Sequence, residues 1–173
     1  AIGAELSVQE PLGNMVVDIG GGTTEVAVIS LGNIVYSRVL RIGGNKMDEN
    51  IAQFVKDKYN LMIEEKSAEK IKKEIGTVAK EPAEKSMEIR GRNLIEGLPQ
   101  TVAIAAEEIK KALEKPIDNI IQAIKIVLEN TPPELSSDVM NNGIILTGGG
   151  GLLGGLVTRI REEIQTPVYL VER

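Results

Sequence analysis

The stretch Asp18-Ile19-Gly20-Gly21-Gly22-Thr23-Thr24-Glu25 joins two short apolar segments near the start of the chain. The segments, 15–18 and 25–30, are rich in β-branched residues, so we expect two antiparallel strands with the glycine run as their turn. Glycine has no Cβ, and consecutive glycines let backbone N–H groups approach an anion closely. The stretch therefore predicts a β-hairpin whose turn binds phosphate.

The polar residues of this turn favour a magnesium-phosphate site. Asp18 ends a predicted strand, and a carboxylate there can hold hydrated Mg²⁺, which prefers one or two carboxylates together with phosphate oxygens and water. An isolated Asp-x-Gly is more simply explained by an Asp that caps its own turn, but the full run favours function. The predicted N–H and hydroxyl donors to the phosphates are Gly20, Gly21, Gly22, Thr23 and Thr24.

A second glycine-rich turn, Thr147-Gly148-Gly149-Gly150-Gly151-Leu152-Leu153-Gly154-Gly155, follows another predicted strand. Its spacing Gly149-x-Gly151-x-x-Gly154 also matches the dinucleotide fingerprint of oxidoreductases, with Glu172 at the end of the next strand, where a ribose-binding acid is expected. The same glycines could instead pack against a purine and ribose, or make a close helix-strand turn. Two such turns in a small domain indicate a nucleotide held from two sides.

The remaining apolar patterns predict an α/β fold that carries an inserted α+β segment. Glu69 and Lys72 are three residues apart on one predicted helix face, from which both can reach a ribose or a base; the alternative is a solvated charged face. The other expected elements are a strand over 34–42, helices from Met47 and after the N-cap Ser67, a hairpin within 80–102, a long helix over 109–128 bent at Pro116 and ended by 131–133, and a strand-helix-strand unit over 143–146, 152–164 and 168–171.

Composition limits the classes of function. A formal net charge of −5 and a pI near 5.0 argue against a nucleic-acid or anionic-membrane binder. Without cysteine or histidine, the chain has no disulfide, no thiolate metal site and no serine-histidine triad. We find no membrane span or signal peptide and expect a soluble, cytoplasmic protein. The start at Ala1, without an initiator methionine, indicates a fragment.

Five segments together closely resemble the second half of the MreB family of bacterial actin homologues. They are 18–25, Arg41-Ile42-Gly43-Gly44, Ala68-Glu69-Lys70-Ile71-Lys72-Lys73-Glu74-Ile75-Gly76, Thr131-Pro132-Pro133-Glu134-Leu135 and Leu146-Thr147-Gly148-Gly149-Gly150. The resemblance covers essentially all 173 residues. It is specific to MreB and its close paralogues rather than to the wider group of actins, sugar kinases and heat-shock chaperone ATPases.

The resemblance implies an α/β fold with a ribonuclease-H-like (actin-like ATPase) core and a mixed five-stranded sheet. The core subdomain would comprise 1–44 and 103–173, interrupted by a small α+β subdomain at 45–102. In this family ATP (or GTP) and Mg²⁺ lie in a cleft between two such halves. This chain resembles only one half, so we expect it to bind nucleotide weakly and to be inactive alone.

The resemblance also implies a role for each matched residue and a set of partners. Asp18 would position Mg²⁺ through water; Gly20, Gly21, Gly22, Thr23 and Thr24 would hold the β- and γ-phosphates; Glu69 and Lys72 would contact ribose and base; and Gly148, Gly149 and Gly150 would line the adenosine. The full-length family forms membrane-associated filaments that work with cell-shape and wall-synthesis proteins. We expect no nucleic-acid partner and no direct membrane contact from this half.

Two other classes of function remain open from the residues. One is a non-catalytic assembly or scaffold module, and the other is a dinucleotide-binding oxidoreductase domain. The nucleotide-binding half of a cytoskeletal ATPase would bind Mg-ATP, whereas a scaffold module would not. A dinucleotide-binding oxidoreductase domain would instead bind NADH.

Overall fold

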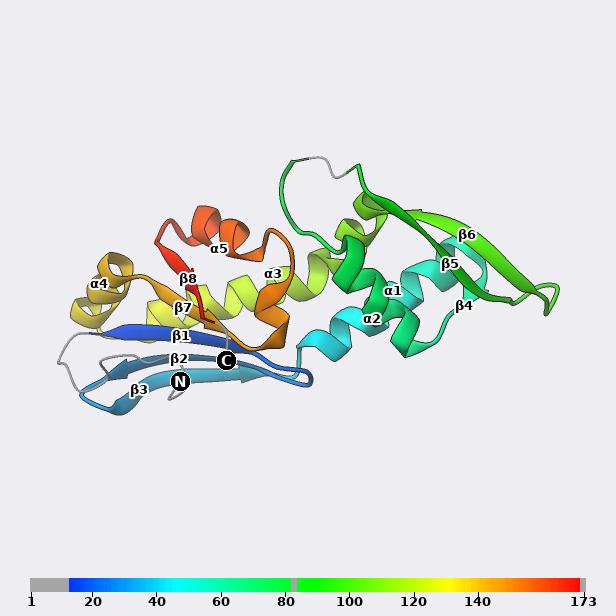
Figure 1. Ribbon diagram of the computed structural model, residues 1–173. Coiled ribbons are helices and arrows are strands. Elements are labelled where there is room, and N and C mark those ends of the chain that lie inside the picture. Colours follow the sequence, from blue (N-terminus) through cyan, green and yellow to red (C-terminus); the bar gives the residue numbers. More distant parts are fainter. Residues whose placement is uncertain (1–12, 82–83, 172–173) are drawn as a thin grey trace.

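The computed structural model, which describes residues 13–81 and 84–171, contains a large and a small sheet at opposite ends of an elongated molecule (Figure 1). The large sheet has five strands in the order β3-β2-β1-β7-β8. Its pairs β1-β2 and β2-β3 are antiparallel, and β1-β7 and β7-β8 are parallel, so the predicted mixed five-stranded sheet is confirmed. The strands are β1 (Asn14–Ile19), β2 (Thr24–Ser30), β3 (Asn33–Leu40), β7 (Ile144–Thr147) and β8 (Val168–Leu170).

The small sheet has three antiparallel strands in the order β4-β5-β6. Its elements are β4 (Leu61–Met62), β5 (Ser86–Asn93) and β6 (Pro99–Ala105), accompanied by α1 (Gly44–Tyr59) and α2 (Glu65–Ile75). The expected hairpin is β5-β6, whereas the very short β4 has no counterpart in the sequence prediction. The prediction that Ser67 is the N-cap of the second helix is wrong. The helix begins at Glu65, because the N–H of Ser67 already donates to the carbonyl of Glu64 within the first turn.

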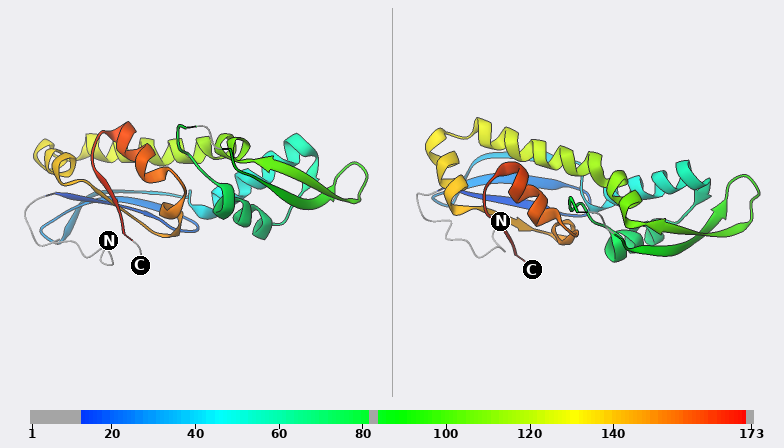
Figure 2. Two further views of the ribbon diagram at one scale, coloured as in Figure 1. Left: turned by 45° about the horizontal axis from the view of Figure 1, so that its top comes forward. Right: turned by 90° about the horizontal axis from the view of Figure 1, so that it is seen from above.

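A long helix, α3 (Ala106–Asn130), runs along the molecule and packs on both parts (Figure 2). Its apolar stripe is confirmed: Ile109, Leu113, Ile117, Ile120 and Ile124 are all fully buried. The helix contacts α1 as well as β2 and β3. Burial of each such side chain stabilises the fold by about 1.5–3 kcal/mol. Pro116 lies inside this helix, which continues past it.

The carboxyl-terminal elements differ in part from the prediction. The helix expected over 152–164 is α5 (Leu156–Ile164), preceded by a 3-10 helix, η2 (Gly149–Leu152), because Gly155 adopts a left-handed φ of 76° and interrupts the helical path. A further helix, α4 (Pro133–Asn142), follows the predicted end of α3 and was not predicted. No helix in the described part of the chain is long and apolar enough to cross a bilayer.

Candidate nucleotide site

The two glycine turns follow neighbouring strands at the same edge of the large sheet. β1 and β7 are parallel, with Asp18 opposite Thr147, so both turns leave the sheet at its carboxyl edge. In open α/β sheets, ligands bind in the crevice outside the carboxyl ends of the strands. The pairing therefore brings together two motifs that are far apart in the sequence.

A cavity of about 690 Å³ lies between the two turns, α1 and α2. Its size is within the range of small-ligand sites. Among the predicted site residues, the cavity is lined by Gly20, Gly21, Glu69, Lys72, Gly149 and Gly150. It is not lined by Asp18, Gly22, Thr23, Thr24 or Gly148. Glu172 lies outside the described residues.

The first turn is held against the beginning of α1 by backbone hydrogen bonds. The N–H of Gly44 donates to the carbonyl of Gly20 at 2.9 Å, and the N–H of Asn45 donates to that of Gly21 at 2.8 Å. The buried Thr24 hydroxyl donates to the carbonyl of Ile42 at 2.6 Å. Thr24 thus fixes the segment that leads into α1, and its hydroxyl already has an acceptor within the protein.

The predicted pair of Glu69 and Lys72 lines the cavity, but each residue has a different ionic partner. The Lys72 ammonium lies 2.8 Å from Asp48 Oδ1 and donates to the carbonyl of Gly44 at 3.1 Å. Glu69 pairs with Lys73 at 2.7 Å, and the hydrogen bond from Lys73 lowers the pKa of this exposed carboxyl. The wall of the cavity therefore carries one buried and one solvated ion pair.

Asp48 was missed by the sequence analysis although a signal was present. Asp48 lies three residues before Ile51, and Ile51 lies four residues before Val55. All three are buried in the structure. A carboxylate within the apolar stripe of a helix requires a partner, because an unpaired buried charge is costly. Here that partner is Lys72.

The second turn approaches the first so closely that a side chain would not fit at Gly148. A Cβ there would lie 2.5 Å from Asp18 Oδ1, and the backbone has a left-handed φ of 88°. The Asp18 carboxylate is therefore in contact with the second turn. Asp18 and Gly148 lie side by side where the two motifs meet.

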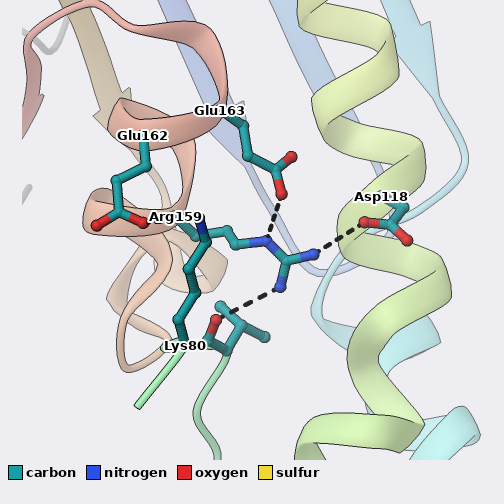
Figure 3. A network of polar contacts seen from close by, with 6 residues as sticks. Lys80, Asp118, Arg159, Glu162 and Glu163 are labelled. Carbon is teal, nitrogen blue, oxygen red and sulfur yellow. Dashed lines mark hydrogen bonds and ion pairs between the residues drawn. The ribbon is translucent and has the colours of Figure 1, made fainter.

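The segment after α2 is fixed to the second turn and to α5. The N–H of Val78 donates to the carbonyl of Gly154 at 2.9 Å. Arg159 of α5 reaches Asp118 of α3 at 3.0 Å, Glu163 at 2.8 Å and the carbonyl of Val78 at 3.4 Å (Figure 3). Sequence reasoning did not identify this network, which joins α3, α5 and the segment following α2.

Comparison with known proteins supports the same class of fold. The family model for MreB/Mbl protein matches residues 1–173. The chain is 49% identical over 172 residues to the cell shape-determining protein MreB of Escherichia coli (strain K12), covering 99% of this chain and 50% of that protein. It is 48% identical over 172 residues to the cell shape-determining protein Mbl of Bacillus cereus (strain ATCC 10987 / NRS 248), covering 99% and 52%.

A crystal structure of MreB5 of Spiroplasma citri bound to AMPPNP has a TM-score of 0.94 at 40% identity, covering 98% of this chain and 51% of that chain. The architecture is thus that of an actin-like α/β protein. The chain belongs to the MreB/Mbl family. It spans about half the length of the curated relatives it matches.

Family membership overturns the oxidoreductase alternative, and the geometry gives the reason. In the dinucleotide fingerprint an α-helix opens directly at the glycines, and its N-terminus holds the pyrophosphate. Here the glycines form a 3-10 helix, and α5 begins only at Leu156. The spacing of the glycines matched the fingerprint without the backbone path that the fingerprint requires.

Proposed function

We propose that this chain forms one wall of the nucleotide site of a cytoskeletal ATPase that polymerises and controls cell shape. The observation that carries the proposal is the parallel β1-β7 pairing, which brings both glycine turns to the edge of one cavity. The MreB5 structure was determined with AMPPNP bound, and the curated relatives are cell shape-determining proteins. ATP, or GTP, is the proposed nucleotide.

The residues present fit a magnesium-nucleotide complex. The described residues contain no cluster of three or more acidic or histidine side chains able to hold a bare metal ion. Mg²⁺ bound to nucleotide needs no such cluster, because it retains several waters and takes phosphate oxygens together with one or two carboxylates. Asp18, at the end of β1, is the proposed carboxylate and would act through water.

Each remaining motif has a proposed part in holding the nucleotide. The first turn would bind the β- and γ-phosphates, and the second turn would line the adenosine. Glu69 and Lys72 would contact the ribose and base. The first turn comprises Gly20, Gly21, Gly22, Thr23 and Thr24, and the second comprises Gly148, Gly149 and Gly150. Bound Mg²⁺ would neutralise part of the phosphate charge. The contribution of this chain to phosphoryl transfer would be positioning and preorganised N–H donors.

The organisation and setting of the protein are proposed on the same basis. Residues 1–44 and 103–173 would act as a core subdomain, with 45–102 as an inserted subdomain. Self-association into filaments, cell-shape and wall-synthesis partners, and a cytoplasmic, membrane-associated location would follow from the family. Neither nucleic acid nor direct membrane contact is proposed for this part of the protein.

The proposal is tested by titrating the ¹⁵N-labelled chain with Mg-ATP to millimolar concentration and following the glycine amides by NMR. We expect saturable shifts in 20–22 and 148–150, and a weaker response for Asp18→Ala when Mg²⁺ is present. Asp57→Ala, which changes an exposed carboxylate on α1, is the matched control and should bind as the parent does. If the parent gives no shifts while sedimentation shows self-association, the scaffold function is the correct one.

A further inference from the structure

The hydroxyl of Thr147 is buried without a hydrogen-bond partner. Thr147 is the last residue of β7 and is 0% exposed. Its Oγ1 atom has no donor or acceptor within reach in the part of the chain that the structure describes. An unsatisfied buried hydroxyl destabilises a fold, and valine would fill the same space without that cost. The threonine therefore requires an explanation other than packing.

The position of Thr147 in the sheet indicates what the hydroxyl serves. Thr147 is the register partner of Asp18 in the parallel β1-β7 pair. The alternate residues Val17 and Leu146 belong to the apolar core, so Asp18 and Thr147 project from the opposite face. Paired side chains on one face of a sheet are close neighbours. The hydroxyl is thus on the same face as the carboxylate that contacts Gly148, but the two form no hydrogen bond in the structure.

We propose that Thr147 is a positioning residue for Asp18. When Mg-nucleotide occupies the cavity, the Asp18 side chain would turn so that one carboxylate oxygen accepts from the Thr147 hydroxyl, and the other oxygen would accept from a water of the metal ion. The hydroxyl can direct its hydrogen toward the incoming oxygen because the O–H bond rotates freely. Groups that hydrogen-bond to a metal-orienting side chain fix the direction of that side chain and tune the affinity of the site for the metal. The inference rests on the proposed function and identifies a residue that would support its metal-positioning carboxylate.

Thr147→Val is the decisive substitution, because a positioning role and a packing role for Thr147 predict different changes in thermal stability and in Mg-ATP affinity. It keeps the shape of the side chain and removes the hydroxyl. We expect its thermal unfolding midpoint without nucleotide to rise by a few degrees, since an unsatisfied group is lost. We also expect the affinity for Mg-ATP to fall about tenfold, as for loss of a hydrogen bond to a charged group. Packing alone would leave the affinity unchanged.

Three further variants complete the experiment. Thr147→Ser keeps a hydroxyl and should restore Mg-ATP affinity to within about threefold of the parent. Thr158→Val, an exposed threonine on α5, should change neither quantity. ATP titrated with EDTA in place of Mg²⁺ should bind the parent and Thr147→Val equally. A lower unfolding midpoint for Thr147→Val, or an unchanged Mg-ATP affinity, overturns the inference.

The outcomes separate this inference from the proposed function. If the parent binds no Mg-ATP, the proposed function and the inference are both wrong. If the parent binds but Asp18→Ala does not weaken Mg²⁺-dependent binding, the proposed role of Asp18 is wrong, and Thr147 has nothing to position. If Asp18→Ala weakens binding and Thr147→Val does not, only the inference is wrong.

Discussion

The Lys72 ammonium and the Asp48 carboxylate form an ion pair of 2.8 Å that joins α2 to α1 along the cavity. Their side chains are only 14% and 9% exposed, so water screens the pair weakly. Lys72 also donates to the carbonyl of Gly44, beside the first glycine turn. The lysine proposed to contact the nucleotide is therefore held in place by groups on both sides before any ligand binds.

Asp48→Ala should destabilise the protein by about 3 kcal/mol, because it leaves the Lys72 charge buried without its partner. Urea unfolding measures this loss. The double variant Asp48→Ala, Lys72→Met should recover much of the stability, since neither charge then remains. Asp57→Ala, on an exposed part of the same helix, is the control and should lie within about 0.5 kcal/mol of the parent. Equal loss in the single and double variants would contradict the assignment.

Gly148→Ala should destabilise the protein by about 2 kcal/mol or more, because the left-handed backbone and the contact with Asp18 both exclude a Cβ. Gly149→Ala is a matched control, since a Cβ there meets nothing within 4 Å. Thermal unfolding of the two variants, side by side, checks the difference. Similar midpoints for both would show that the turns do not approach as closely as described.

Glu108 should make the stability of the protein depend on acid pH. Burial raises the pKa of Glu108, but hydrogen bonds from Lys58, Tyr59 and the N–H of Ala105 outweigh it, so the pKa lies below the ordinary value. A lowered folded-state pKa gives stability that is present above the unfolded value of about 4.3 and is lost as the pH falls through the folded value.

The pH dependence is tested by urea unfolding between pH 7 and pH 3. Glu108→Gln should be less stable than the parent at pH 7, and the difference should shrink as the pH is lowered. Glu129→Gln, a substitution of an exposed glutamate of the same helix, should follow the parent curve. A constant difference between Glu108→Gln and the parent at every pH would contradict the assigned pKa direction.

Arg159→Ala should loosen the segment after α2, because Arg159 donates to the carbonyl of Val78 and to carboxylates of α3 and α5. We expect a loss of about 1–3 kcal/mol in stability and faster hydrogen exchange at 76–80. Arg161→Ala, in the same helix but exposed, should leave both unchanged. Exchange that is faster throughout the chain, rather than at this segment, would indicate a general loss of stability instead.

Several elements could be predicted because their signals are local. The glycine run between β-branched segments is sufficient for the β1-β2 hairpin, and an apolar stripe repeated over many turns is sufficient for α3. β4 could not be predicted, since its two residues are a strand only through pairing with Arg92 and Asn93. α4 was missed for a similar reason, as Val139 is its one buried residue and leaves little periodicity to detect.

Local patterns of residues are sufficient to predict the two glycine turns, the carboxylate at the end of the first strand and the charged face with Glu69 and Lys72. That the turns meet, through the pairing of Asp18 with Thr147, and that Lys72 is held by Asp48 follow from the fold alone. The physical reason is that burial and pairing between distant segments set these contacts, and no local stretch of sequence contains both partners. For the same reason, only the folded structure shows that the buried Thr147 hydroxyl has no hydrogen-bond partner among the described residues.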